Sequence, residues 1–374
     1  MKIIFVVNEL DFFIRTHFNL ARSINETHEV EVIADASKSS TKNLDLVEKM
    51  GIKLHVLNRK KNSKNIFSYL SFIFSLLSLL RKIKPDYVFY ITLEISFFGS
   101  LISYFLKIKK SIFIVTGLGP FFFKKEFKYR FFNRLQRHSF RLLGILRNNF
   151  HFIFLNSADR ELLTSIYKIN SYNFSVIHGE GINGLEFRNI QRDTSIPKFL
   201  LASRLIQSKG IECYITAAKR IKAKYPHVEF SIAGIFDLNN PESISLQLFE
   251  EIKTDADVKF WGEISHSNME ECFHKHNIFV LPSEREGLPK VVTEAATTGM
   301  PLILSDVPGC KDCVINDKSG KLVNYMNEKE LYDAMKSFVD DTDMITLMGK
   351  ESAKFARDKF SIETITKKYF EIIS

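Results

Sequence analysis

The most informative segment of the chain reads Leu281-Pro282-Ser283-Glu284-Arg285-Glu286-Gly287-Leu288-Pro289-Lys290-Val291-Val292-Thr293-Glu294-Ala295. An apolar strand is expected to end here, and the chain turns at Gly287 before a helix begins. Glu286 then lies on the turn, and Glu294, eight residues later, lies on the helix. Two carboxylates so placed can accept hydrogen bonds from several hydroxyls of one polyhydroxylated ligand. The other interpretation is ordinary acidity at a helix start.

A second segment, Ser203 to Gly210, also follows an expected strand and opens a helix. It places Arg204 at the strand end and Lys209 five residues later. Two cations at a helix N-terminus can neutralise a diphosphate, because the free N–H groups there also favour an anion. A solvated arginine and a helix-opening lysine are the alternative.

Short β-rich runs alternate with helical stretches along the whole chain, which predicts βαβ units and parallel sheets. Helices are expected over residues 15–25, 66–83 and 209–224, and Pro226 ends the last of them. A polar stretch near 180–195 divides two doubly wound domains, 1–185 and 190–360. The expected strands of the two domains are 2–7, 29–34, 53–57, 86–91, 111–115, 151–155 and 174–177, and then 198–202, 229–233, 258–261, 278–281 and 301–304.

Composition excludes several classes of protein. The chain has 374 residues, 45% of them hydrophobic and 25% charged, which excludes large-scale disorder. Four cysteines cannot form a disulfide framework, so a reducing cytoplasm is expected. The apolar run at residues 3–7 is too short for a signal peptide, and the serine-interrupted run 67–80 is too short for a membrane span, which needs about 20 residues.

Charge and aromatic residues are unevenly distributed. Residues 1–188 hold 28 Lys+Arg against 15 Asp+Glu and 24 of the 35 Phe, whereas the remainder holds 24 against 28. Eight of the basic residues lie in 121–150, interleaved with Phe and Leu and accompanied by one acidic residue, Glu126. This pattern predicts an amphipathic helix that contacts an anionic membrane surface. A core helix with a solvated face and nucleic-acid binding are the alternatives, and we expect no nucleic acid.

The two segments, followed by Gly299-Met300-Pro301 and Ser305-Asp306, resemble the hallmark sequence of retaining glycosyltransferase family four. The resemblance implies an α/β chain with the GT-B fold, in which two Rossmann-like domains face a cleft and a C-terminal helix, 361–374, packs back on the first. It implies that Arg204 and Lys209 hold the donor diphosphate, Glu286 the donor sugar and Glu294 the ribose. Further donor contacts are implied for Gly287, Leu288, Pro289, Gly234, Trp261 and Glu263. Trp261 either stacks on the base or packs as a strand-end aromatic.

The first half matches this family less fully. Gly117 and Gly119 follow a strand, as in a subgroup that builds surface polysaccharides and glycans on polyprenyl diphosphate, although a tight turn explains them equally. Arg15 and His17 are further candidates for the acceptor side, and a surface role is their alternative. Asp312 stands where many relatives have Glu, and the first βα turn lacks a glycine pair.

The resemblance implies transfer of a hexose or N-acetylhexosamine from a UDP-sugar to a lipid-linked saccharide, without metal or cofactor. We expect a bacterial protein held peripherally at the inner face of the cytoplasmic membrane, in capsule, O-antigen or other lipopolysaccharide assembly. A nucleotide-sugar epimerase or hydrolase of related fold, and a non-catalytic basic membrane binder, are the rival functions. The pair Cys310 and Cys313 lacks a second pair or histidines, so a redox or zinc site is not expected.

Overall fold

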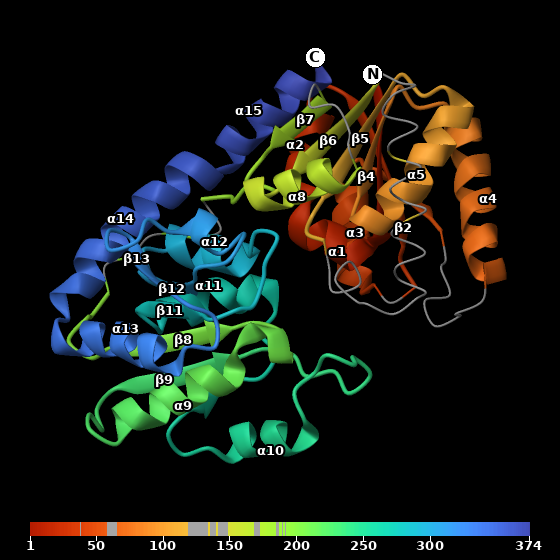
Figure 1. The fold of residues 1–374 in the computed structure, drawn as a ribbon. Helices are drawn as coiled ribbons and strands as arrows, with labels where there is room; N and C mark the ends of the chain where they lie inside the picture. The colour runs from red at the N-terminus through yellow and green to blue at the C-terminus, as the bar shows by residue number, and fades with distance from the viewer. Residues whose placement is uncertain are drawn as a thin grey trace. The chain divides into compact units, whose positions relative to one another are not determined.

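The computed structural model describes residues 1–37, 39–57, 66–118, 134, 140, 149–167, 173–184, 187–188, 190 and 192–374. The chain divides into two compact units (Figure 1). The first unit contains Met1–Glu180 and Lys368–Ser374, and the second contains Gly181–Lys367. Most of the basic segment 121–150 lies outside the described residues, apart from Arg134, Phe140, Asn149 and Phe150.

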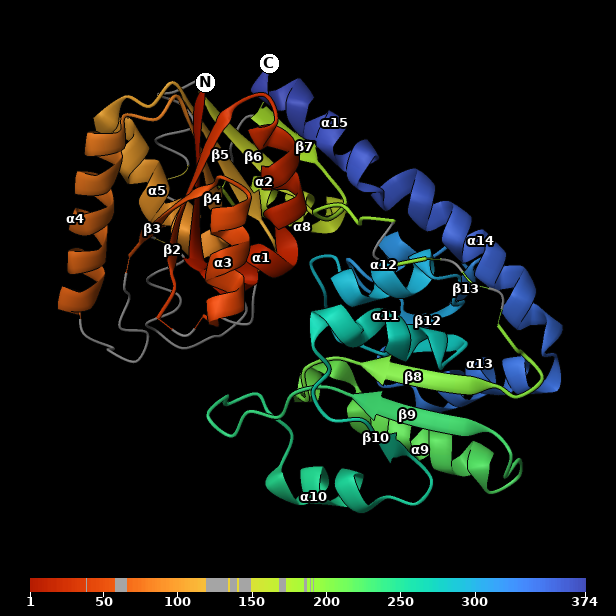
Figure 2. The same ribbon diagram turned by 180° about the vertical axis from the view of Figure 1, so that it is seen from behind.

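The first unit is built on a parallel sheet whose described strands have the order β3-β2-β1-β4-β5-β6-β7. The central strands β1, β4 and β5 are largely apolar and buried on both faces, as expected where helices cover a parallel sheet on both sides. Helices α1–α3 lie on one side of it and α4 and α5 on the other (Figures 1 and 2). The strands are β1 (Lys2–Glu9), β2 (Glu29–Asp35), β3 (Lys53–Val56), β4 (Tyr87–Ile91), β5 (Lys110–Val115), β6 (Phe150–Phe154) and β7 (Phe174–Val176).

Helix α4 has the bounds expected from the sequence, residues 66–83. A single helix was expected over residues 15–25, but the chain breaks at His17 between two shorter helices. The described helices are α1 (Leu10–Thr16), α2 (Phe18–Asn25), α3 (Thr41–Lys49), α4 (Ile66–Ile83), α5 (Leu93–Leu106) and α8 (Ser157–Tyr167).

Phenylalanine fills the core of the first unit. Phe113 packs against Phe140, Phe150 and Phe152 with ring centroids 4.9–6.2 Å apart, and Phe5 stacks on Phe89 at 4.7 Å. Aromatic pairs at such distances add stabilisation to the burial of their large apolar area. Much of the Phe excess in this half of the sequence is therefore core packing.

The second unit is a six-stranded parallel sheet of order β10-β9-β8-β11-β12-β13. Helices α9 and α13 cover one face, and α11 and α12 cover the other (Figure 2). Five strands fall within two residues of the expected positions, whereas β13 was not expected from the sequence. The strands are β8 (Lys198–Ala202), β9 (Glu229–Ala233), β10 (Lys259–Phe260), β11 (Ile278–Leu281), β12 (Leu302–Ser305) and β13 (Gly320–Val323).

The helices of this unit are α9 (Ile211–Lys222), α10 (Leu246–Thr254), α11 (His266–His274), α12 (Lys290–Thr297), α13 (Glu328–Asp340) and α14 (Asp343–Phe360), with single 3-10 turns at Gln207–Lys209 and Lys311–Cys313. The final helix, α15 (Ile362–Ile373), carries its last residues into the first unit. There the ring of Tyr369 lies 6.2 Å from that of Phe89, and Lys110 donates a hydrogen bond to the carbonyl of Ile372.

Candidate active site

The candidate site lies at the carboxyl edge of the second sheet, where β8 and β11 are neighbours. Strand order reverses between these two strands, since β9 and β10 lie beyond β8, and β12 and β13 lie beyond β11. Loops diverge at such a reversal, and ligands of doubly wound sheets bind there. The segment with Arg204 and Lys209 follows β8, and the segment with Glu286 follows β11. The fold therefore brings the two sequence motifs together.

Glu286 and Lys209 form an ion pair across this reversal. Lys209 Nζ lies 2.5 Å from Glu286 Oε1, and only 13% of each side chain is exposed. The buried Ser283 donates a second hydrogen bond to the same oxygen at 2.9 Å. No described residue donates to the other oxygen, Oε2, which can therefore accept a hydrogen bond from a ligand. Sequence reasoning named Glu286 and Lys209 separately and did not name Ser283, although Ser283 lies within the quoted segment.

Two close backbone approaches fix the Glu286 turn. The Glu284 N–H donates to the Ser208 carbonyl at 2.8 Å, which joins the two loops. Gly309 has φ +82°, and a Cβ there would lie 2.4 Å from the carbonyl oxygen of Glu286. Any side chain at Gly309 would displace the turn.

Arg204 differs from Lys209 in being exposed. Its side chain is exposed at the end of β8, and no described residue forms a hydrogen bond or ion pair with its guanidinium. An exposed arginine in the same loop as Lys209 is suited to an incoming anion, since its forked donors match phosphate oxygens.

Glu294 lies in the middle of α12 and is only 3% exposed. His266 Nε2 lies 3.0 Å from Glu294 Oε1, and Lys290 Nζ lies 3.7 Å from the same atom. A buried carboxylate is stable only when it is hydrogen-bonded or paired, and these two groups meet that need. His266, the first residue of α11, was missed because its only signal in the sequence is its place after a strand end.

The other donor-side residues line the same edge. Gly234, with φ +158°, donates its N–H to the Gly262 carbonyl at 2.8 Å, and a Cβ there would lie 1.8 Å from the Ser203 carbonyl oxygen. Leu288 is buried, Glu263 is exposed, and Gly287 and Pro289 complete the turn into α12.

The Trp261 side chain is hydrogen-bonded and packed against residues of the second unit. Its indole Nε1 donates to Ser231 Oγ at 3.1 Å, and its ring packs edge-on against His276 at 5.3 Å. Lys259 Nζ lies 4.7 Å from the ring centroid. A base stacking on Trp261 would have to displace Lys259 or Lys275, which flank the ring.

The acceptor-side candidates lie in the first unit. His17 is fully buried between α1 and α2, with Nδ1 2.7 Å from Thr16 Oγ1, whereas Arg15 is exposed. Gly117 follows β5 with φ +138°, and Gly119 lies outside the described residues. The structure thus brings the donor-side residues together on one sheet edge and leaves His17 as a core residue at the α1–α2 break.

The cysteines are all free and buried. Burial raises the pKa of Cys310 and of Cys313 well above the usual thiol range, so both are neutral thiols at neutral pH. Cys313 Sγ donates to the carbonyl of Gly309 at 3.3 Å. Within the described ranges, no three His, Cys, Asp or Glu side chains are grouped so that they could hold a metal ion. In the same part of the chain, every helix is too short or too polar to cross a membrane.

Solved structures establish the class of fold. The sucrose-phosphate synthase of Thermosynechococcus elongatus aligns with a TM-score of 0.78 at 16% identity, covering 100% of this chain and 98% of that one. Anabaena HepE in complex with UDP and glucose aligns with a TM-score of 0.77 at 16% identity, covering 100% and 99%. The chain is therefore a GT-B protein with two Rossmann-like domains, as the sequence predicted.

Family models and relatives then identify the family. The model described as "Glycosyl transferase 4-like" matches residues 2–149, and "Glycosyl transferases group 1" matches residues 185–355. The chain therefore contains two glycosyltransferase domains, one of each of these families. It is 27% identical over 362 residues to the N,N'-diacetylbacillosaminyl-diphospho-undecaprenol alpha-1,3-N-acetylgalactosaminyltransferase of Campylobacter jejuni, covering 92% of this chain and 90% of that protein. It is 24% identical over 323 residues to the capsular polysaccharide biosynthesis glycosyltransferase CapM of Staphylococcus aureus, covering 83% and 82%.

Proposed function

We propose that this protein transfers a hexose or N-acetylhexosamine from a UDP-sugar to a polyprenyl-diphosphate-linked saccharide, with retention of anomeric configuration. The observation that carries the proposal is the Lys209–Glu286 pair at the strand reversal, with the exposed Arg204 in the same loop as Lys209. This arrangement offers cations to a diphosphate and a carboxylate oxygen to sugar hydroxyls within one small region. The name of the Campylobacter relative supports the acceptor class and the N-acetylhexosamine, and the UDP complex of HepE supports the donor class.

Each residue has a role that follows from its charge. Arg204 and Lys209 bind the diphosphate and stabilise the charge that develops on it as it leaves, which is where we expect most of the acceleration. Glu286 accepts hydrogen bonds from the sugar hydroxyls and orients the anomeric carbon. Glu294 accepts hydrogen bonds from the ribose hydroxyls. His266 and Lys290 hold its carboxylate in place on α12.

The transfer step balances without a metal or cofactor. The bond from the anomeric carbon to the diphosphate oxygen breaks, and UDP leaves with the bonding electrons. The acceptor hydroxyl oxygen forms the new bond on the same face of the sugar. Its proton passes to the departing phosphate oxygen, which lies on that face, so no separate protein base is needed. Arg204 and Lys209 hold this phosphate throughout the step.

A panel of nucleotide sugars tested against extracted lipid-linked acceptors, with products weighed by mass spectrometry, tests the proposal. We expect one UDP-sugar to add one hexose or N-acetylhexosamine to the lipid-linked acceptor, with an anomeric proton coupling that shows retention. Lack of transfer from every UDP-sugar would contradict the donor class. Epimerisation or hydrolysis at a rate independent of the acceptor would contradict the transferase function itself.

Association with the membrane is a separate part of the proposal, and it places the protein at the cytoplasmic face where such acceptors are made. It rests on the basic, Phe-rich composition of residues 121–150. Neutralising Lys124, Lys125 and Arg134 together is expected to lower affinity for anionic vesicles by roughly 100-fold at low salt, at about 1 kcal/mol per charge. Flotation with phosphatidylglycerol vesicles measures this, with phosphatidylcholine vesicles as the control. Undiminished binding of the triple variant would show that another surface carries the contact.

A further inference from the structure

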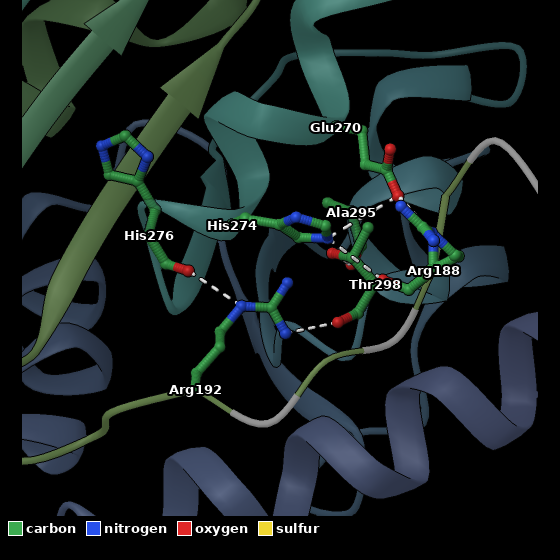
Figure 3. Close-up of polar contacts among 7 residues, drawn as sticks. All are labelled: Arg188, Arg192, Glu270, His274, His276, Ala295 and Thr298. Carbon is green, nitrogen blue, oxygen red and sulfur yellow. Dashed lines mark hydrogen bonds and ion pairs between the residues drawn. The ribbon is translucent and has the colours of Figure 1, made fainter.

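Arg192, in the stretch of chain that precedes β8, is hydrogen-bonded to the ends of helices α11 and α12. Arg192 Nε donates to the carbonyl of His276 at 3.0 Å, and its Nη1 donates to the carbonyl of Thr298 (Figure 3). The sequence predicted only a polar linker in this region, and the structure shows a largely buried guanidinium instead. Burial lowers the pKa of Arg192 to about 10, so the side chain is still a cation at neutral pH.

The two carbonyls that Arg192 binds lie at the ends of α11 and α12. Thr298 caps the C-terminus of α12, and His276 follows the capping residue of α11. Both helices therefore direct their negative dipole ends toward the same guanidinium. A planar fork of donors can join two carbonyls at once, which a lysine ammonium on a single nitrogen does less well.

These two helices also carry Glu294, which is proposed to bind ribose, and His266, which holds its carboxylate. His266 is the first residue of α11, Glu294 lies on α12, and their side chains are 3.0 Å apart. The helices are thus joined near the site by His266 and Glu294, and at their far ends by Arg192. The same segment packs along α11 at Phe187, whose ring lies edge-on against that of His266 at a centroid distance of 5.6 Å.

We propose that Arg192 is a positioning residue of the donor site, which fixes α12 against α11 and so holds the Glu294 carboxylate at the ribose. This inference rests on the proposed role of Glu294. Arg192 touches no substrate, and its effect on UDP is transmitted by the two helices. Its Nη2 atom is buried and has no hydrogen-bond partner among the described residues. Within the described part of the chain, the two carbonyl contacts are thus the hydrogen bonds that hold the guanidinium.

A double-mutant cycle on UDP affinity tests this role. Titration calorimetry of UDP is carried out on the wild type, Arg192→Lys, Glu294→Gln and the double variant. We expect Arg192→Lys to weaken UDP binding roughly tenfold in the wild type and less than about twofold in the Glu294→Gln background, because residues that act through one another are not additive. The donor KM is expected to rise by the same factor with kcat nearly unchanged, since ribose binding is equal in ground and transition states.

Two further variants separate positioning from general stability. Arg192→Met removes the hydrogen-bond donors but keeps much of the apolar stem. It should weaken UDP binding more than Arg192→Lys does in the wild type, and again have little effect in the Glu294→Gln background. Arg188→Ala is the matched control. Arg188 belongs to the same segment, is 71% exposed and contacts Glu270 at 3.4 Å on the outer side of α11 (Figure 3). Its loss should leave UDP affinity within about twofold of the wild type.

The outcomes distinguish this inference from the proposed function. If Glu294→Gln alone leaves UDP affinity unchanged, then the proposed role of Glu294 is wrong and the inference is wrong with it. If Glu294→Gln weakens binding but Arg192→Lys and Arg192→Met do not, only the inference is overturned. Equal losses from Arg192→Lys in both backgrounds would also overturn it, because Arg192 would then act independently of Glu294.

Discussion

Arg204→Ala is expected to lower kcat/KM for sugar transfer by about 100- to 1000-fold, the usual cost of removing one donor that stabilises developing charge. The same substitution should leave the free energy of unfolding within about 0.5 kcal/mol of the wild type, because the guanidinium is exposed and has no partner among the described residues. Initial rates and thermal unfolding of the same preparation measure both quantities.

Arg357→Ala provides the control for Arg204. Arg357 is an exposed arginine of the same unit, in the last turn of α14, so its removal changes net charge equally. It should leave the transfer rate unchanged. A loss of activity in Arg357→Ala as large as that in Arg204→Ala would mean that overall charge matters. Activity of Arg204→Ala near the wild-type value would remove the residue from the site.

Glu286→Gln is the second substitution with a large expected effect. The amide keeps an acceptor oxygen for Ser283 and Lys209, so the turn should stay in place, but the charge that orients the sugar hydroxyls is lost. Hydrogen bonds to a charged acceptor are about twice as strong as neutral ones. We expect kcat to fall by roughly 100-fold, with UDP affinity changed less than about threefold, because Glu286 is assigned to the sugar and not to the nucleotide.

Glu284→Gln is a matched control for this experiment, two residues earlier on the same turn. The Glu284 side chain is exposed, and the contact that joins this turn to Ser208 uses its backbone N–H, which the substitution retains. The rate of transfer by Glu284→Gln should equal that of the wild type. If the two variants lose activity equally, the effect belongs to the turn as a whole. If Glu286→Gln retains full activity, its carboxylate does not orient the sugar.

Most strands of the two parallel sheets could be predicted from the sequence, because strands that are buried on both faces are near-continuous apolar runs. The runs at residues 2–7 and 278–281 are therefore visible without any structure. Strand β13 was missed because it is only four residues long and begins with Gly320. The backbone of Gly320 packs so closely against the Leu302 carbonyl that no side chain would fit there. Strands of this kind have too few apolar side chains to give a signal.

The residues proposed for the donor site were named from the sequence where they are close together in it, and their contacts to distant residues were not. Glu286 and Glu294 lie within one segment, and Arg204 and Lys209 within another. In contrast, His266 is 28 residues from Glu294, and Arg192 reaches Thr298 across 106 residues. Such pairs are set by how α11 and α12 pack, which composition and spacing do not encode. The break at His17 was missed because the apolar periodicity continues through it.

The central claim is that the carboxyl edge of the second sheet binds the donor nucleotide, and a titration of UDP tests it most directly. The affinity for UDP is measured by calorimetry at one temperature for the wild-type chain and for a triple variant. The triple variant combines Arg204→Ala, Lys209→Met and Glu294→Gln. We predict one UDP bound per wild-type chain and affinity at least about 100-fold lower in the triple variant, since three charge-assisted contacts are removed. UDP binding by the triple variant as tight as that by the wild type would contradict the claim.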